Sequence, residues 1–386
     1  MKDGIINVYK EKDMTSNDVI GIMKIILRIK KLGHTGTLDP MATGVLPVLI
    51  NRGTRVAEYM DVDFKTYKAT MILGCETDTY DVTGEVLEVT DEDIALCEEE
   101  VKKKLNSFLG LIDQMPPMYS AVRINGRKLY RYMHEAPKEE IESVLKKVKP
   151  RQVYIKDVLL VDMGYMDKGQ IDYPLAQKLK DKVPYITFKV TCSKGTYIRT
   201  ICHDLGNALG TCGTMLSLER TEVGVFKKEN SIKLSELRKL SISLGLTYEE
   251  NGRLKGIGEL KEDIPDSLME YVFPLDYPLT NFGEVVVKKD VARKFIDGWH
   301  LSYNEVNVKK EPSYIMPIEK EELRDAVPTS SSNHHGSYPG LKVHPEYKKA
   351  YKIYDEEGVF LGVAFHNDQY KKLVADKVLV RNDSYK

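Results

Sequence analysis

The most informative stretch of the chain reads Gly33-His34-Thr35-Gly36-Thr37-Leu38-Asp39-Pro40-Met41-Ala42-Thr43-Gly44, and an apolar run over 45–50 that predicts a strand follows it. The stretch places one carboxylate, that of Asp39, in a loop rich in glycine and threonine. Pro40 drives the residue before it toward extended backbone geometry. The glycines permit turns and a close approach by a ligand. Asp39 is therefore either an ordinary turn residue or a carboxylate that the loop orients for chemistry.

A helix is predicted to lead into this loop. Thr15-Ser16-Asn17-Asp18 places a capping hydroxyl three residues before an acid, which is typical of a helix start. Gly33 predicts the helix end. The apolar positions in between recur at helical spacing, namely Val19, Ile22, Met23, Ile26 and Leu27. The cations near the end of this helix either complement the helix dipole or hold phosphate.

Strands and helices alternate irregularly along the rest of the first 245 residues. We predict further strands at 67–73, 84–89, 153–160 and 185–192, and further helices at 55–60, 94–109, 196–209 and 231–244. A loop punctuated by proline and glycine is predicted over 114–132. Because hairpin spacing is common among the strands, the pattern indicates an α+β fold with a mixed, mostly antiparallel sheet and flanking helices.

The length of 386 residues favours two domains. We predict a first domain over 1–245, a boundary region over 246–282 and a small β-rich second domain over 283–386. The second domain is predicted to contain strands at 284–288, 351–355 and 359–365, a hairpin turn at Glu356-Glu357-Gly358 and a long polar insertion over 309–345.

Composition excludes several classes of protein. A hydrophobic fraction of 42% and a charged fraction of 30% are ordinary for a globular protein, and a net charge of −1 requires any RNA-binding face to be local. The five cysteines form no C-x-x-C pair, so we expect buried thiols in the reducing cytoplasm and no metal site. The chain has no apolar run of about 20 residues, as a membrane span requires, and no glycine-rich nucleotide motif. We therefore expect a soluble cytoplasmic protein without a nucleotide cofactor.

Three further motifs carry residue types that serve catalysis. They read Lys65-Thr66-Tyr67-Lys68-Ala69, Cys192-Ser193-Lys194-Gly195-Thr196-Tyr197-Ile198-Arg199-Thr200 and Leu216-Ser217-Leu218-Glu219-Arg220-Thr221-Glu222-Val223-Gly224. Taken alone, Tyr67 and Leu218 are typical of a sheet core, and Arg199 of an exposed helix face. The loop after Gln114 adds several basic and tyrosine side chains.

Together with the Asp39 loop, these motifs resemble the TruB family of tRNA pseudouridine synthases. The resemblance covers about residues 3–245, and the C-terminal part more weakly resembles a small PUA-type RNA-binding barrel. It implies an isomerase that converts uridine to pseudouridine at position 55, in the T-loop of tRNA. It also implies that the reaction needs neither a cofactor nor a metal ion.

The resemblance assigns three residues to catalysis. Asp39 corresponds to the nucleophile, which attacks either C6 of the base or C1′ of the ribose, and the sequence leaves both open. Tyr67 corresponds to the tyrosine that stacks on the extruded uracil and helps to remove the C5 proton. Arg199 corresponds to the arginine that pairs with the catalytic aspartate.

Further residues are implied to bind the substrate. Tyr197 and Leu218 would line the base pocket, and His34 would fill the gap that the extruded base leaves. The basic residues of the 114–129 loop would contact phosphates of the T-arm, namely Arg123, Arg127 and Lys128.

The chain departs from the family pattern in places. Tyr9-Lys10-Glu11 stands where the family usually has Lys-Pro, and residues 166–182 are longer than usual. The 309–345 insertion has no recognised counterpart. The short segment before Ile5 resembles the stand-alone bacterial form, so we expect a monomer that acts without a guide RNA or an obligate protein partner.

Two other classes remain open from the sequence. In the first, the chain is an RNA-binding or tRNA-folding module with little or no catalysis. In the second, it is a nucleoside glycosidase, although that chemistry usually requires a second carboxylate, and no acid lies near Asp39 in its loop.

Overall fold

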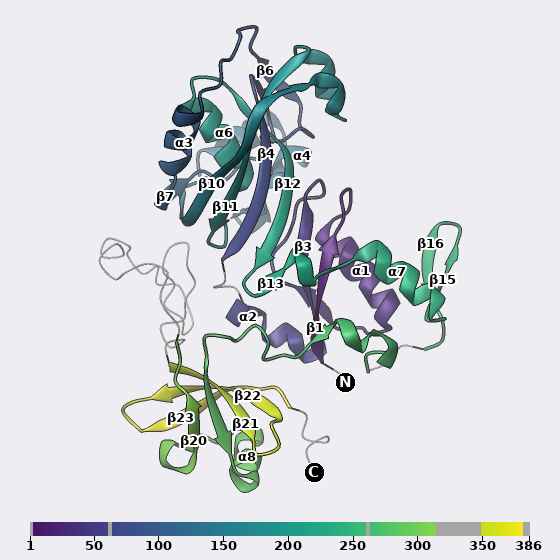
Figure 1. Cartoon of the computed structure of the whole chain (residues 1–386), viewed down its shortest axis with the longest axis vertical. Helices are drawn as coiled ribbons and strands as arrows, with labels where there is room; N and C mark the ends of the chain where they lie inside the picture. The colour runs from purple at the N-terminus through teal and green to yellow at the C-terminus, as the bar shows by residue number, and fades with distance from the viewer. Residues whose placement is uncertain (1–2, 61–63, 260–262, 314–348, 381–386) are drawn as a thin grey trace.

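The computed structural model describes residues 3–60, 64–259, 263–313 and 349–380, and Figure 1 shows their arrangement. Most of the predicted insertion, from residue 314 onward, lies outside the described residues. Eleven strands form one sheet and six form another, with short hairpins beside them. Within the described ranges, no helix is long and apolar enough to cross a membrane.

The large sheet is mixed and mostly antiparallel, as predicted. Its order is β14 (Ile232–Lys233), β1 (Gly4–Lys10), β3 (Thr43–Ile50), β12 (Gly213–Val223), β4 (Lys65–Leu73), β11 (Lys182–Cys192), β10 (Arg151–Asp167) and β7 (Gly110–Gln114). Only the β1–β14 and β3–β12 pairs are parallel. The short strands β2 (Leu32–His34), β13 (Phe226–Lys227) and β17 (Val272–Phe273) pair with β3, β12 and β1.

Strand β12 joins the two halves of this sheet. It runs antiparallel to β4 for most of its length but meets β3 over only two residue pairs, Glu219↔Thr43 and Arg220↔Gly44. Gly44 has φ +114°, and a Cβ atom there would lie 2.1 Å from the Arg220 carbonyl oxygen. Only glycine fits this position, because the two backbones meet without room for a side chain. The junction fixes where the Asp39 loop enters β3.

Helix α1 (Ser16–Leu27) begins as predicted, with Thr15 and Asp18 forming a capping box. The predicted end at Gly33 is wrong. The helix ends at Leu27 because Arg28 adopts the left-handed conformation, with φ 59°. The residues that follow then enter β2, which pairs with β3.

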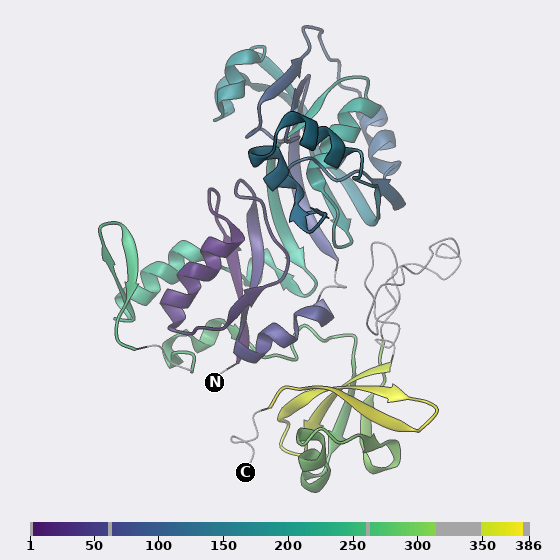
Figure 2. The ribbon, with the colours of Figure 1, turned by 180° about the vertical axis from the view of Figure 1, so that it is seen from behind.

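The other helices flank the sheet. They are α2 (Ala57–Met60), α3 (Glu98–Asn106), α4 (Leu129–Glu135), α5 (Lys138–Leu145), α6 (Ile198–Ala208) and α7 (Leu234–Ser243). Helix α3 is shorter than predicted, and α4 begins inside the predicted 114–132 loop. In Figure 2, α4 and α5 lie on the face of the sheet that Figure 1 turns away from the viewer.

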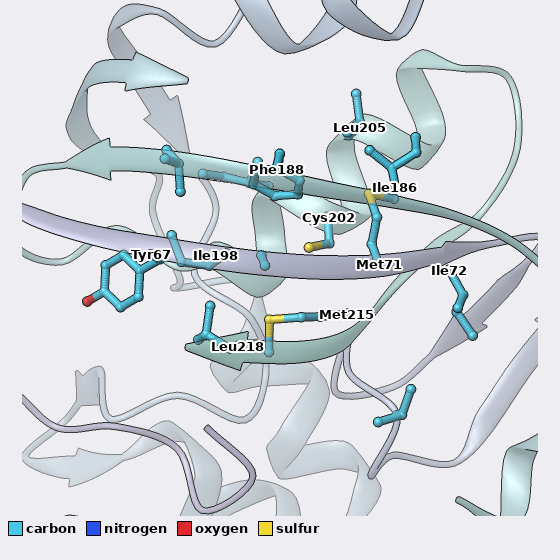
Figure 3. Close-up of a cluster of buried hydrophobic side chains, with 14 of the residues drawn as sticks. Tyr67, Met71, Ile72, Ile186, Phe188, Ile198, Cys202, Leu205, Met215 and Leu218 are labelled. Carbon is cyan, nitrogen blue, oxygen red and sulfur yellow. The ribbon is translucent and has the colours of Figure 1, made fainter. Parts of the chain in front are cut away.

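Two apolar clusters hold the large sheet and its helices together. One lies between α6 and strands β4, β11 and β12, and Figure 3 shows Cys202 and Leu205 of the helix over Met71 and Phe188 of the strands. The other lies between α1 or α7 and strands β1 and β3. Burial of each large aliphatic side chain contributes about 1.5–3 kcal/mol, so these clusters fix the elements that carry the site.

The second sheet has the order β19 (Leu301–Ser302), β23 (Lys372–Val378), β22 (Phe360–Asn367), β21 (Ala350–Asp355), β18 (Gly283–Val287) and β20 (Asn307–Lys310). Helix α8 (Lys289–Ile296) packs on it. The predicted hairpin turn before Phe360 is confirmed, since β21 and β22 are antiparallel neighbours. The expected domain boundaries stay a prediction. Part of the 246–282 region joins the large sheet, because β17 pairs with β1.

Candidate active site

Asp39 lies in the loop between β2 and β3, close to the start of α1. Backbone hydrogen bonds hold the loop on both sides: Ala42 N donates to Asp39 O at 3.0 Å, and Asp13 N donates to Pro40 O at 2.9 Å. Leu38 N donates to the Ser16 hydroxyl at 2.9 Å. The Asp39 side chain itself is 40% exposed. The loop therefore presents a fixed carboxylate that a substrate can reach.

The guanidinium of Arg199 lies beside this carboxylate. Arg199 Nε is 3.1 Å from Asp39 Oδ2, and the Arg199 side chain is only 7% exposed. Its other nitrogens donate to Thr79 O at 3.0 Å and to Tyr119 O at 3.1 Å. Arg199 is in the first turn of α6, so the helix that packs on the core also aims the cation. The structure thus brings together the two residues that the sequence analysis pairs.

A second carboxylate, which the sequence analysis missed, completes this group. Arg199 Nη1 lies 3.3 Å from Asp81 Oδ2, and the Asp81 side chain is 5% exposed. The other Asp81 oxygen accepts from Thr79 Oγ1 at 3.0 Å and from Thr83 N at 2.9 Å. A buried cation between two carboxylates compensates the cost of burying each charge. The sequence feature that could have indicated Asp81 is the presence of threonines two residues before and after it, at 79 and 83.

Tyr67 lies next to this group on β4, where it pairs with Arg220 of β12. Burial raises the pKa of the Tyr67 phenol, although the Arg220 guanidinium partly offsets this rise in pKa. Tyr67 is therefore a neutral phenol near neutral pH. Tyr67 and Leu218 belong to the same buried cluster, and Figure 3 shows the Tyr67 hydroxyl pointing away from the other labelled side chains.

Two buried cations hold the backbone on either side of Asp39. Arg220 Nε donates to Val45 O at 2.8 Å, and its Nη2 donates to Gly36 O at 3.1 Å. Lys10 Nζ donates to Pro40 O at 3.1 Å. Burial lowers the pKa of Lys10 to about 8, and the Asp39 charge counteracts this lowering. The sequence analysis assigned no role to Lys10 or Arg220, although they lie in two of the segments discussed there, 9–11 and 216–224.

His34 and Tyr197 take positions at the edges of the site. His34 is on β2, and burial, followed by the Arg220 charge, lowers its pKa, so the imidazole is neutral near neutral pH. Tyr197 caps α6. The buried Gln114 clamps its backbone, since Tyr197 N donates to Gln114 Oε1 at 2.7 Å and Gln114 Nε2 donates to Tyr197 O at 3.0 Å.

The three basic residues expected to contact RNA lie on a separate hairpin. Strands β8 (Arg123–Ile124) and β9 (Arg127–Lys128) pair around a turn. Arg123 is exposed, whereas Arg127 pairs with Glu135 at 2.6 Å. Lys128 Nζ lies 5.6 Å from the Tyr130 ring centroid. The hairpin belongs to the same loop as Tyr119, whose carbonyl accepts from Arg199.

Metal-ligating side chains gather elsewhere. In the described part of the chain, Glu76, Glu88 and Cys212 are the group whose ligand atoms lie within 4.8 Å of one another. None of the residues assigned to the site belongs to this group. The chemistry available at Asp39 is thus that of a carboxylate, a guanidinium, a neutral phenol and a neutral imidazole.

A long mixed sheet, a half-exposed aspartate on a buried arginine and an adjacent buried tyrosine define the class of pseudouridine synthases. Two solved structures share this fold. A Cbf5-Nop10-Gar1 complex has a chain that is 21% identical with a TM-score of 0.60, covering 100% of this chain and 87% of that one. A chain of an H/ACA RNP bound to a substrate RNA containing 2′-deoxyuridine is 19% identical, also with a TM-score of 0.60, covering 99% of this chain and 87% of that one.

Sequence comparison narrows the class to one family. The model of the TruB family pseudouridylate synthase N-terminal domain matches residues 24–198, and that of the tRNA pseudouridylate synthase B C-terminal domain matches 199–280. The tRNA pseudouridine synthase B of Clostridium novyi is 33% identical, covering 98% of this chain and 100% of that protein. That of Clostridium tetani is 45% identical, covering 62% of this chain and 74% of that protein. The chain belongs to the TruB family of pseudouridylate synthases.

Proposed function

We propose that this chain isomerises uridine 55 in the T-loop of tRNA to pseudouridine, with Asp39 as the nucleophile. The observation that carries the proposal is the Asp39–Arg199 ion pair at 3.1 Å, in which the arginine is buried and the carboxylate is accessible. Membership of the TruB family and relatives named tRNA pseudouridine synthase B support the reaction and the substrate class.

The reaction needs one nucleophile and no net change in atoms. Asp39 attacks C6 of the uracil or C1′ of the ribose, which divides one difficult step into two easier ones. The N1–C1′ bond breaks, the uracil turns in the pocket, and a C5–C1′ bond forms. The bond from Asp39 to the substrate breaks as well, which regenerates the free carboxylate. The proton on C5 leaves to solvent, and N1 takes up a proton. The product is an isomer of the substrate.

The buried groups position this nucleophile. The Arg199 guanidinium fixes the direction of the Asp39 oxygens through their ion pair. Asp81 holds the opposite side of the same guanidinium. Lys10 and Arg220 fix the loop backbone at Pro40 and Gly36. A positioned reactant of this kind lowers the barrier because little motion is left to restrict.

The substrate base has to leave its stack before it reaches Asp39. Extrusion of a nucleotide costs a few kcal/mol. Tyr67 offers a neutral ring on which uracil stacks, and Leu218 and Tyr197 exclude water around it. The neutral imidazole of His34 fills the space that the base vacates. The positive hairpin of Arg123, Arg127 and Lys128 contacts phosphates of the T-arm.

The enzyme acts as a monomer without a guide RNA or an obligate protein partner, and it needs neither metal nor cofactor. The rival function is a tRNA-folding module with an inactive pocket. The Asp39–Arg199–Asp81 group favours catalysis, because a buried cation there orients a carboxylate that solvent and substrate can reach.

Purified protein incubated with an unmodified tRNA transcript tests the proposal. Pseudouridine is then mapped by primer extension after carbodiimide treatment, without added metal. We expect one new stop, at the T-loop uridine. A stop elsewhere contradicts the substrate assignment, and tight tRNA binding without any stop supports the folding module. Free uracil in the supernatant identifies a glycosidase.

A further inference from the structure

Two aromatic rings close to Arg199 in the fold stack on each other, and the proposed function uses neither of them. The rings of Tyr80 and His203 have centroids 4.0 Å apart and planes inclined by only 16°. Tyr80 belongs to the turn between β5 (Cys75–Thr77) and β6 (Val86–Val89), directly before Asp81. His203 is on α6, one turn after Arg199. The stack therefore connects the two elements that supply the Arg199–Asp81 pair.

Tyr80 holds an unusual backbone conformation. Its φ is +62°, in the left-handed region that bulky residues rarely adopt. Backbone hydrogen bonds fix it on both sides, since Tyr80 N donates to Thr77 O at 3.1 Å and Met215 N donates to Tyr80 O at 3.0 Å. Rare backbone conformations persist only where their surroundings enforce them, and they cluster at functional sites. Here the conformation sets the direction of the next residue, Asp81.

One edge of the His203 ring forms a hydrogen bond and the other edge faces a carboxylate. Its Nε2 is hydrogen-bonded to Nδ2 of Asn207 at 3.0 Å. Nδ1 faces Glu76 Oε1 at 3.8 Å. Glu76 is on β5, in the hairpin that carries Tyr80. The imidazole is thus oriented as a flat surface for the tyrosine ring.

We propose that the Tyr80–His203 stack is a positioning unit that holds Asp81 against Arg199 and so aims the Asp39 carboxylate. The inference rests on the proposed function of Asp39. Neither ring belongs to the 123–128 hairpin that grips tRNA. Loss of the stack therefore changes the rate of the chemical step and leaves tRNA binding intact. Tyr80 and His203 act through other residues and do not touch the substrate.

Steady-state kinetics of His203→Ala and His203→Phe test the unit. The alanine variant loses the stacking face, and we expect kcat to fall about 10- to 100-fold, the size of a small misplacement, with an unchanged KM for tRNA. The phenylalanine variant keeps a flat ring and retains most of the activity. An unchanged kcat in His203→Ala, or an equal loss in both variants, overturns the proposal.

A double-mutant cycle separates positioning from general destabilisation. If the stack acts through Asp81, adding His203→Ala to Asp81→Asn lowers kcat no further, since residues in one network are not additive. Multiplicative losses overturn the proposal.

A readout independent of tRNA is the nuclear magnetic resonance signal of the Arg199 Nε–H. We expect its hydrogen exchange to accelerate about tenfold in His203→Ala and to stay slow in His203→Phe, because an opened ion pair admits water. Unchanged exchange in the alanine variant contradicts the positioning role even if the protein proves inactive on tRNA.

Discussion

At the scale of single residues, Arg199 organises the site because one guanidinium serves two carboxylates. Its Nε faces Asp39 and its Nη1 faces Asp81, while the carbonyl oxygens of Thr79 and Tyr119 accept from two of the three other hydrogens. A planar fork with five donors suits this arrangement, and a lysine ammonium does not. The carboxylate that we propose as the nucleophile is therefore held by buried groups.

Asp81→Asn tests this dependence. The amide keeps the shape of the side chain but removes the charge that balances Arg199, so the guanidinium shifts toward Asp39. We expect kcat to fall by about 100-fold or less, with tRNA affinity unchanged in a filter-binding assay. Thr83→Val, which removes one hydroxyl beside Asp81, serves as the milder control. Full activity in Asp81→Asn contradicts the shared role of Arg199.

The lowered pKa of Lys10 predicts how the free energy of unfolding depends on pH. Burial lowers its pKa from an ordinary value of 10.5 to about 8 in the folded protein. Between these two values the unfolded chain binds more protons than the folded one, so the free energy of unfolding rises with pH. Relative to Lys10→Met, we expect the wild-type protein to gain up to about 3 kcal/mol between pH 8 and 10.5.

Urea unfolding of both proteins at pH 7.5 and pH 10 measures this difference. A wild-type protein that loses stability relative to the variant on raising the pH contradicts the lowered pKa of Lys10.

The residues that sequence reasoning missed share one physical cause. Arg199 and Asp81 are 118 positions apart, and Lys10 reaches Pro40 from a neighbouring strand. Burial at such a site arises when distant segments pack together, so the threonines around Asp81 indicate a turn but not its contact with Arg199. The proximity of Asp39 and Arg199 could be predicted because each lies in a motif that resembles a known family, while the roles assigned to them and to Tyr67 stay predictions.

At the scale of elements, the start of α1 was predictable and its end was not. The capping box needs only Thr15 and Asp18, which are local. The end depends on the left-handed backbone of Arg28, a conformation that glycine usually adopts at helix ends. It also depends on the pairing of β2 with β3, which is a tertiary contact. Strand β10 likewise extends to Asp167 because β11 pairs with it from Ile155 to Asp167.

The β3–β12 junction makes a sharp prediction for Gly44→Ala. The added methyl collides with the Arg220 backbone at 2.1 Å and strains a φ of +114°. We expect the free energy of unfolding to fall by more than about 3 kcal/mol, since overpacking and backbone strain combine. Gly110→Ala is the matched control, because that glycine has φ +90° but no neighbour within 4 Å.

Thermal unfolding of the two variants separates the cost of the steric collision from the cost of the backbone strain. Equal losses contradict a steric requirement at the junction and leave backbone strain as the sole cost.

At the scale of the whole molecule, the net charge of only −1 leads us to expect that a local surface binds tRNA. The α+β class and the mostly antiparallel sheet followed from the spacing of predicted strands. The parallel contact between β3 and β12 did not, because strand order follows from packing and not from periodicity. The separate six-stranded sheet agrees with the β-rich character predicted for the C-terminal part.

Arg123→Ala combined with Lys128→Ala tests the proposed T-arm surface. Removing two phosphate contacts lowers the slope of log K against log salt by about 1.4–1.8, while kcat at saturating tRNA stays unchanged. Lys102→Ala on α3 is the control for charge removal outside the hairpin. An unchanged salt slope in the double variant shows that another surface holds the T-arm.

The most direct test of the central claim is tritium release from tRNA labelled at C5 of uridine, compared between wild-type protein and Asp39→Asn. The asparagine is nearly isosteric but cannot act as a nucleophile at this site. We predict release by the wild type and none by the variant, with tRNA affinity nearly equal for both proteins. Release by Asp39→Asn at a rate comparable to the wild type would contradict the assignment of Asp39 as the nucleophile.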